Sequence, residues 1–272
     1  MSKKIEKSTG THEIFNEEKI KKSLRKAGAS KSLAQEIVEK IKTIPKIKST
    51  KDIYTYILKY LHEKNRPIAA RYNLKYALME MGPAGFPFEK FVAEIFRHQE
   101  HRVKIREIIK GYCVEHEIDF VARKNNKAII AECKFHNRRG LKSDLKVVLY
   151  VKSRFDDIKN ANKKETLRAL IVTNTKFTSQ AIKYAECVGL ELIDWSYPHG
   201  KSLPYIVHKL GLHPITALTS LSKKQKTQFI KHGIVLCKQT EKHVHILKEL
   251  GLTDHQIKKI IQESNNVCKL KM

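Results

Sequence analysis

Two short apolar segments decide the fold, Glu117-Ile-Asp-Phe-Val-Ala122 and Ala128-Ile-Ile-Ala-Glu-Cys-Lys-Phe135. The polar stretch Arg123-Lys-Asn-Asn-Lys127 separates them, and this pattern predicts a β-hairpin. Side chains alternate between the two faces of a strand, so Glu132 and Lys134 share one face. We therefore expect a carboxylate and an ammonium group to project from the same side of the second strand.

Asp119, in the first strand, brings a second carboxylate if it meets that face. Two carboxylates can hold a hard divalent cation such as Mg²⁺ or Mn²⁺, which polarises a phosphoryl oxygen and acidifies a bound water. Lys134 can orient that water or offset developing charge. The alternative is a solvated strand face with ordinary cross-strand ion pairs. The apolar neighbours Ile129 and Ile130 favour the metal, because charges set among buried residues are costly unless paired or metal-bound.

Composition limits the class of protein. The chain has 272 residues, enough for two or three small domains. It carries 54 Lys+Arg against 28 Asp+Glu, and this net charge of +26 favours a polyanionic partner over a generally lysine-rich, solvated surface. The sequence shows no apolar run of membrane-spanning length, no signal-peptide core, and five scattered cysteines without CxxC spacing. We expect a cytoplasmic protein without zinc and without a membrane partner.

Two Gly/Pro-containing segments divide the chain, Met81-Gly-Pro-Ala-Gly-Phe-Pro87 and Tyr197-Pro-His-Gly200. They predict three domains, at residues 1–84, 85–199 and 200–272. The first and third have mainly helical patterns. The second alternates helix, hairpin, helix, strand, helix and strand, which is typical of an α/β sheet with flanking helices.

In the first domain, residues 4–15 predict a short hairpin turning at Thr9-Gly10, and Asn16 caps the helix that follows. This arrangement resembles the ATP-cone, a small nucleotide-binding module. The matching residues are Ile5-x-Lys7-x-x-Gly10, Phe15-Asn16-x-x-Lys19-Ile20-x-x-Ser23-Leu24, Thr50-x-x-Ile53 and Ala70-Arg71-Tyr72.

The resemblance implies that Lys7 and Lys19 contact the phosphates of ATP or dATP, acting as a regulatory ligand. Two ammonium groups near a glycine turn and a helix end make a reasonable anion site. The family usually has Arg immediately after the first lysine, where this chain has Ser8, so one phosphate contact is lost. The alternative is a plain helical bundle with solvated lysines.

The central domain resembles the PD-(D/E)xK nuclease superfamily, specifically the Mrr-type restriction endonuclease domain, over about residues 86–196. The residues that carry the resemblance are Phe88-Glu89, Ile118-Asp119, Glu132-Cys133-Lys134, Val172-Thr-Asn-Thr-Lys-Phe-Thr178 and Leu192-Ile-Asp194. It implies that Asp119 and Glu132 bind Mg²⁺, that Lys134 handles the attacking water, and that Glu89 supports the site. Many such domains have Gln at the position of Glu132, and a second carboxylate strengthens the metal site.

The helix expected over residues 143–160 places Lys146, Tyr150 and Arg154 on one face. A basic-aromatic-basic row beside the carboxylates could clamp a phosphate backbone, and Lys146-x-x-x-Tyr150 resembles the Gln-x-x-x-Tyr pair of related nucleases. The alternative is a solvated face with a half-buried tyrosine.

Three other polar residues lie near the expected site. We expect His116 to be a packing or capping residue. His136 lies on the same strand face as Lys134 if the alternation continues, so we expect it to approach the edge of the site. Asn174 ends a buried strand, where binding residues and turn residues are both common.

Residues 200–272 contain 13 Lys, no Arg and four acidic residues, so this is the most basic part of the chain by density. Residues 218–234 resemble a helix-hairpin-helix element, which presents backbone amides and lysines to phosphates. A packing cap or an oligomerisation element is an equally good interpretation.

Together these features predict a nucleotide-regulated, Mg²⁺-dependent DNA endonuclease with a restriction-endonuclease-like central sheet, a helical ATP-cone before it and a small helical domain after it. The same site could act on RNA, so that substrate stays open. The alternative is a non-catalytic, nucleotide-responsive DNA-binding regulator on a nuclease-like scaffold. The chain has no Walker A loop, so ATP hydrolysis is not expected.

Overall fold

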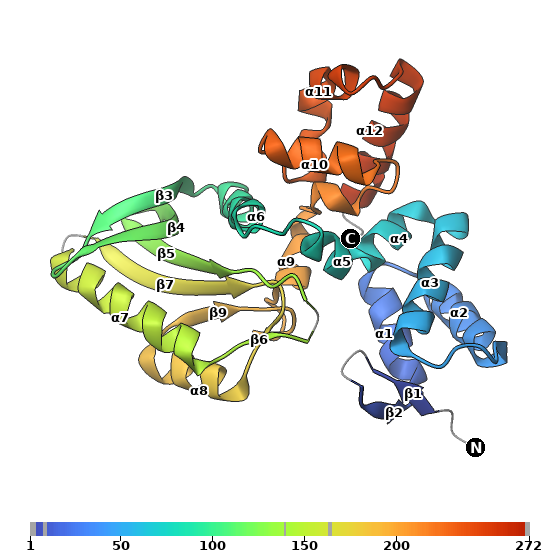
Figure 1. The fold of residues 1–272 in the computed structure, drawn as a ribbon, viewed down its shortest axis with the longest axis horizontal. Coiled ribbons are helices and arrows are strands. Elements are labelled where there is room, and N and C mark those ends of the chain that lie inside the picture. Colours follow the sequence, from blue (N-terminus) through green and yellow to red (C-terminus); the bar gives the residue numbers. More distant parts are fainter. Residues whose placement is uncertain (1–3, 8–9, 139, 163–164, 270–272) are drawn as a thin grey trace.

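A five-stranded mixed sheet forms the core of the middle part of the chain and lies on the left in Figure 1. The computed structural model describes residues 4–7, 10–138, 140–162 and 165–269. The strands, in their order across the sheet, are β3 (Arg102–Lys110), β4 (Glu115–Lys124), β5 (Lys127–Lys134), β7 (Thr166–Thr173) and β9 (Glu191–Ile193). The first three strands pair antiparallel, and β5, β7 and β9 pair parallel. The α/β class predicted for this region is confirmed.

The β4–β5 connection is the predicted hairpin. Its two turn residues, Asn125 and Asn126, have φ of 50° and 57°. Two consecutive left-handed residues characterise the type I′ turn, whose twist matches that of the flanking strands, and Asn tolerates this conformation better than most side chains. The turn sets the register in which Phe120 pairs with Ala131.

Strand β3 was not predicted, and its sequence explains why. Val103 and Ile105 pack on one face of the sheet, whereas Ile109 packs on the other. Between them, Arg106 has φ of 52°, and Ile109 after it packs on the opposite face of the sheet. In the sequence, Glu107 interrupts the alternation of apolar and charged residues, and Ile108 and Ile109 then follow in succession, so there is no clean period of two.

Helices cover both faces of the sheet. Helix α6 (Phe86–Arg97) packs Phe88, Phe91 and Val92 into the core on one face. On the other face lie α7 (Leu145–Ala161) and α8 (Ser179–Val188). Because both faces are covered, β5 and β7 are buried along most of their length.

A small two-stranded element, not predicted from the sequence, lies beyond the ends of β5 and β7. Strands β6 (Lys142–Ser143) and β8 (Lys176–Phe177) pair parallel, with Lys142 opposite Lys176. Runs of two residues are too short to show any period, so the pattern of the sequence could not reveal them.

The N-terminal domain has the predicted order of a hairpin followed by helices. Its elements are β1 (Lys4–Glu6), β2 (His12–Ile14), α1 (Glu17–Lys26), α2 (Lys31–Thr43), α3 (Thr50–Lys64), α4 (Arg66–Tyr72) and α5 (Leu74–Met79). Asn16 caps α1, as expected, and Ser49 caps α3. The helical stretch after Pro67 is divided at Asn73 into α4 and α5. Ser8 and Thr9 lie outside the described residues.

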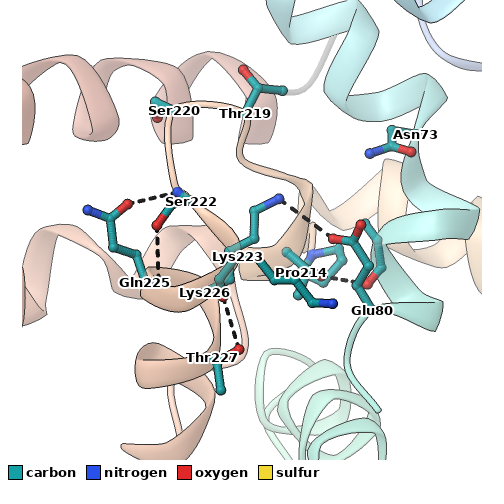
Figure 2. Close-up of polar contacts among 12 residues, drawn as sticks. Asn73, Glu80, Pro214, Thr219, Ser220, Ser222, Lys223, Gln225, Lys226 and Thr227 are labelled. Carbon is teal, nitrogen blue, oxygen red and sulfur yellow. Dashed lines mark hydrogen bonds and ion pairs between the residues drawn. The ribbon is translucent and has the colours of Figure 1, made fainter. Parts of the chain in front are cut away.

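The C-terminal domain is helical, as predicted. Its elements are α9 (Leu203–Leu210), α10 (Lys223–Lys231), α11 (Val244–Glu249), α12 (Asp254–Cys268) and the short 3₁₀ turns Ile215–Ala217, Cys237–Gln239 and Glu241–His243. Figure 2 shows that Ser222 and Gln225 form a capping box at the start of α10. In the same view, Lys226 lies 3.6 Å from the Glu80 carboxylate, which joins α10 to the end of α5.

Arg71 on α4 joins the N-terminal and C-terminal domains. Its side chain donates to the carbonyls of Asn266, Val267 and Lys269, at 2.7, 3.1 and 3.2 Å. These carbonyls end α12 and lack partners within the helix, so a cation is well placed there. Arg71 is only 8% exposed.

Across the described ranges of the chain, no helix combines the length and apolar character that a membrane crossing requires.

Replacing Arg71 by Met should destabilise the protein by about 2–4 kcal/mol, because several partly buried carbonyls lose a charged donor. Urea unfolding followed by circular dichroism measures the change. The exposed Arg25→Met on α1 is the matched control and should stay within about 0.5 kcal/mol of the wild type. Equal midpoints for the two variants would contradict the interdomain role of Arg71.

Candidate active site

The β4–β5 hairpin brings the two predicted carboxylates together. Asp119 directly precedes Phe120, which pairs with Ala131, so Asp119 lies beside Glu132 on the neighbouring strand. The backbone N–H of Cys133 donates to the Asp119 carboxylate at 2.7 Å. A β-strand amide thus holds Asp119 in place, and its remaining oxygen can face the site.

Strand β4 changes phase at Asp119. Phe120 and Ala122 belong to the core beneath α6, whereas Ile118 packs with Ile158 of α7 on the other face. Regular alternation would place Ile118 and Phe120 on the same face, so the side chains switch faces between them. Arg106, at the corresponding position of β3, has φ of 52°. The distortion brings Asp119 within electrostatic reach of residues on both sides of the sheet.

Glu132 is 7% exposed and lies between two cations. The ammonium of Lys134 is 2.6 Å from one carboxylate oxygen, and the guanidinium of Arg154 is 2.8 Å from the other. Arg154 also donates to the backbone carbonyl of Glu117. Burial of this carboxylate is therefore offset by direct charge pairing.

Asp119 and Glu89 are less well compensated. Burial, with the neighbouring Glu132 charge, raises the pKa of Asp119 to about 6, although the Cys133 N–H opposes the shift. Burial and the charges of Asp119 and Glu132 raise the pKa of Glu89 to about 7. Arg106, 4.0 Å from Glu89, acts in the opposite direction. Glu89 on α6, Asp119 and Glu132 therefore share one region of negative potential, which a cation would relieve.

This donor set fits a magnesium ion. Within the described ranges of the chain, no three His, Cys, Asp or Glu side chains form a complete metal-binding cluster. Mg²⁺ commonly takes only one or two protein carboxylates and completes its octahedron with water and substrate phosphate. That Asp119 and Glu132 hold such an ion stays a prediction of the sequence.

The predicted row on α7 is divided between two environments. Lys146 and Tyr150 are exposed, and Tyr150 keeps 58% of its surface accessible. Arg154 points inward to Glu132, with its guanidinium carbon 5.3 Å from the centre of the Tyr150 ring. In this arrangement Arg154 belongs to the carboxylate site, whereas Lys146 and Tyr150 of the predicted row face solvent.

Sequence reasoning missed Arg106. Its guanidinium lies 4.3 Å from the centre of the Phe86 ring and 4.0 Å from Glu89. The residue could not be found without β3, and no sequence pattern predicts a positive φ at an arginine. A non-glycine residue in this conformation beside the carboxylates is a form of local strain that clusters at functional sites.

The neighbouring histidines have structural partners. His116 pairs with Asp157 of α7 at 2.8 Å, as expected of a packing residue. The His136 ring contacts Ser143 Oγ at 3.0 Å. Asn174 accepts from the His136 N–H and donates to the His136 carbonyl, both at 2.8 Å, so it fixes the chain that follows β5.

Lys7 and Lys19 of the N-terminal domain also come together. Both ammonium groups lie 2.9 Å from the same oxygen of Glu13. Hydrogen bonds from Lys19 and then Lys7 lower the pKa of that carboxyl. Beside them is a recess of about 190 Å³ whose lining includes Lys19, Thr50 and Tyr72.

Two family models match the middle and the C-terminal part of the chain. Residues 80–196 match a family model described as restriction endonuclease, and residues 213–268 match one described as AF1548-like, C-terminal. An uncharacterised protein of Archaeoglobus fulgidus is 34% identical over 177 residues, which is 65% of this chain and 99% of the relative. A crystal structure titled as AF1548, a protein of unknown function, superimposes with a TM-score of 0.57 and 32% identity, over 68% of this chain and 98% of that one.

Neither family model extends into residues 1–79, so the ATP-cone stays a prediction. The A. fulgidus relative is 34% identical, and the match covers 99% of its length. The chain therefore belongs to the AF1548-like family and joins a restriction endonuclease-like domain to an AF1548-like C-terminal domain.

Proposed function

We propose that the protein is a Mg²⁺-dependent endonuclease that hydrolyses DNA with a metal-activated water. The observation that carries this proposal is the convergence of Asp119, Glu132 and Lys134 on adjacent strands of a restriction endonuclease-like domain. When bound, the metal would polarise the scissile phosphate and lower the pKa of its water. The raised pKa values of Asp119 and Glu89 support a site that accepts positive charge.

Lys134 and Glu89 have distinct roles in this proposal. About a third of the Lys134 side chain is exposed (32%), so its ammonium can reach a water or a phosphate oxygen while Glu132 holds it in place. Glu89, with a pKa of about 7, exchanges a proton readily near neutral pH and can accept one from the attacking water.

DNA is the proposed substrate because of the restriction endonuclease-like domain and the net charge of +26. Lys146 and Tyr150 present a cation and an aromatic ring beside the site and could contact the phosphate backbone. Contacts through lysines predict steep salt dependence and little sequence preference. The same chemistry serves RNA, so both nucleic acids belong in the test.

The N-terminal domain is proposed to bind ATP or dATP through Lys7 and Lys19. The convergence of the two ammonium groups on Glu13, next to a recess, supports this role. Nucleotide phosphates could replace Glu13 as the partner of the lysines. The nucleotide would act as a regulatory ligand.

Supercoiled plasmid should be nicked in Mg²⁺ and left intact in EDTA. Glu132→Ala, Asp119→Ala and Lys134→Ala should each lower the cleavage rate at least 100-fold, because each removes a metal ligand or the charge beside the water. Gel-shift affinity for the same DNA should change little. Reactions with and without ATP give the sign of regulation.

Glu115→Ala, an exposed carboxylate on the same strand as Asp119, is the matched control and should cleave normally. Retained binding with no cleavage by the wild type in any metal would favour the non-catalytic regulator. Strong loss of DNA binding in Asp119→Ala or Lys134→Ala would contradict the roles assigned to them.

Metal binding can be tested without cleavage. The folded pKa of Asp119, about 6, lies above its ordinary value of 3.8, so the folded state binds more protons between these values and stability falls as pH rises through them. Asp119→Asn removes this cost and keeps an acceptor for the Cys133 N–H. The variant should be more stable than the wild type by about 2 kcal/mol at pH 8 without metal, with the difference vanishing below pH 4.

Magnesium should raise the thermal midpoint of the wild type at pH 8 and leave that of Asp119→Asn unchanged, because ligand binding stabilises the folded state only where the site exists. The rise should shrink below pH 6, where protons compete for Asp119. Asp254→Asn, an exposed carboxylate on α12, should respond like the wild type. An equal magnesium shift in Asp119→Asn would place the metal elsewhere.

A further inference from the structure

A cleft of about 390 Å³ separates the N-terminal domain from the nuclease-like domain. Its volume is within the range of small-molecule sites. The wall from the N-terminal domain contains Tyr54, Tyr72, Tyr76 and Lys75, and the opposite wall contains Lys142 and Lys176. None of the comparisons assigns a role to this cleft.

One wall of the cleft is aromatic. The rings of Tyr54 and Tyr76 stack with centroids 4.1 Å apart and planes at 26°, and Tyr72 continues the stack at 5.7 Å and 20° from Tyr54. Aromatic faces bind planar bases by stacking, with little dependence on the identity of the base. This wall favours a ligand with a flat ring.

The other wall is cationic. Strands β6 and β8 place Lys142 in register with Lys176, and Lys75 approaches from the N-terminal domain. Among the described residues that line the cleft, none is acidic. Like charges directly opposite each other in a strand pair are unfavourable, and an anion shared between them removes the repulsion. A flat ring and an anionic group together describe a nucleotide.

The cleft adjoins the recess beside Lys19. Thr50, Tyr54 and Tyr72 line both spaces, so the recess and the cleft share one wall. The recess alone, at about 190 Å³, is smaller than the usual range for a ligand of nucleotide size. A ligand that contacts Lys19 and exceeds the recess would extend along the tyrosines into the cleft.

We propose that a nucleoside polyphosphate binds across this shared wall and is held from both domains, by Lys19 and the tyrosines on one side and by Lys142 and Lys176 on the other. The proposal rests on nucleotide binding by the N-terminal domain and adds the contacts from the nuclease-like domain. Those contacts make the ligand a link between the two domains.

The cationic wall is connected to the carboxylate site through His136. Ser143, next to Lys142, contacts the His136 ring at 3.0 Å, and Asn174, which precedes Thr175 in the same wall, holds both backbone groups of His136 at 2.8 Å. His136 lies two residues after Lys134. A polyphosphate that neutralises Lys142 and Lys176 strengthens the β6–β8 pair, and this pair fixes the chain that carries Lys134. The nucleotide should therefore accelerate cleavage.

ATP binding by the full chain, without DNA or added metal, tests the proposal. The chain has a single tryptophan, Trp195, whose ring centre lies 5.4 Å from the Lys75 ammonium, so its fluorescence should report on the cleft. Calorimetry gives the dissociation constant independently. Lys142→Glu and Lys176→Glu should weaken ATP binding at least tenfold, and Lys142→Gln should weaken it less. Lys127 is an exposed lysine at the start of β5, and Lys127→Glu should change the ATP affinity less than twofold.

Each variant should have a thermal midpoint and a circular dichroism spectrum like those of the wild type, which checks that it folds. Unchanged ATP affinity in Lys142→Glu and Lys176→Glu would overturn the proposal, as would the absence of any ATP binding. Loss of affinity for duplex DNA in these variants, with ATP affinity retained, would assign the lysines to the nucleic-acid path instead. Asp119→Ala should bind ATP like the wild type, so a failure of the nuclease and a failure of this site give different results.

Discussion

The concentration of negative charge around Asp119 is the constraint on which the site depends. Glu132 has two cationic partners, Lys134 and Arg154, at 2.6 and 2.8 Å. Asp119 has a backbone amide, and Glu89 has Arg106 at 4.0 Å. The pKa values of Asp119 and Glu89 rise as a result. Carboxylates kept in so unfavourable a position are expected where a cation or a proton takes part in function.

The sheet supplies the rigidity that such a site requires. Strand β5 lies at the centre, antiparallel to β4 and parallel to β7, and helices cover both of its faces. Glu132 and Lys134 therefore project from the most constrained strand of the domain. Asp119 projects from the one point of β4 where the alternation changes, so the strand pairing remains intact on either side of the distortion.

The features that the sequence predicted well are local ones. The β4–β5 hairpin and the Asn16 cap of α1 each depend on a few neighbouring residues. Strand β3 escaped prediction because Glu107 interrupts its alternation, and the partners of Arg154 escaped it because they arise from packing of α7 on the sheet. Asp119 and Glu132 lie together because the hairpin turn sets the register of the two strands. Which cations neutralise each carboxylate depends on the tertiary structure.

Helices α4 and α5 are where the three domains meet (Figure 1). Arg71 holds the end of α12, the Ala77 carbonyl accepts from Thr216 at 2.6 Å, and Lys75 lies over Trp195 of the nuclease-like domain. Tyr72 and Tyr76, on the same two helices, form part of the cleft wall. A ligand that moved these tyrosines would act on α4 and α5, which are fixed to both the nuclease-like and the C-terminal domain. Small shifts of these helices would therefore move both domains, because the contacts are direct and no linker absorbs the shifts.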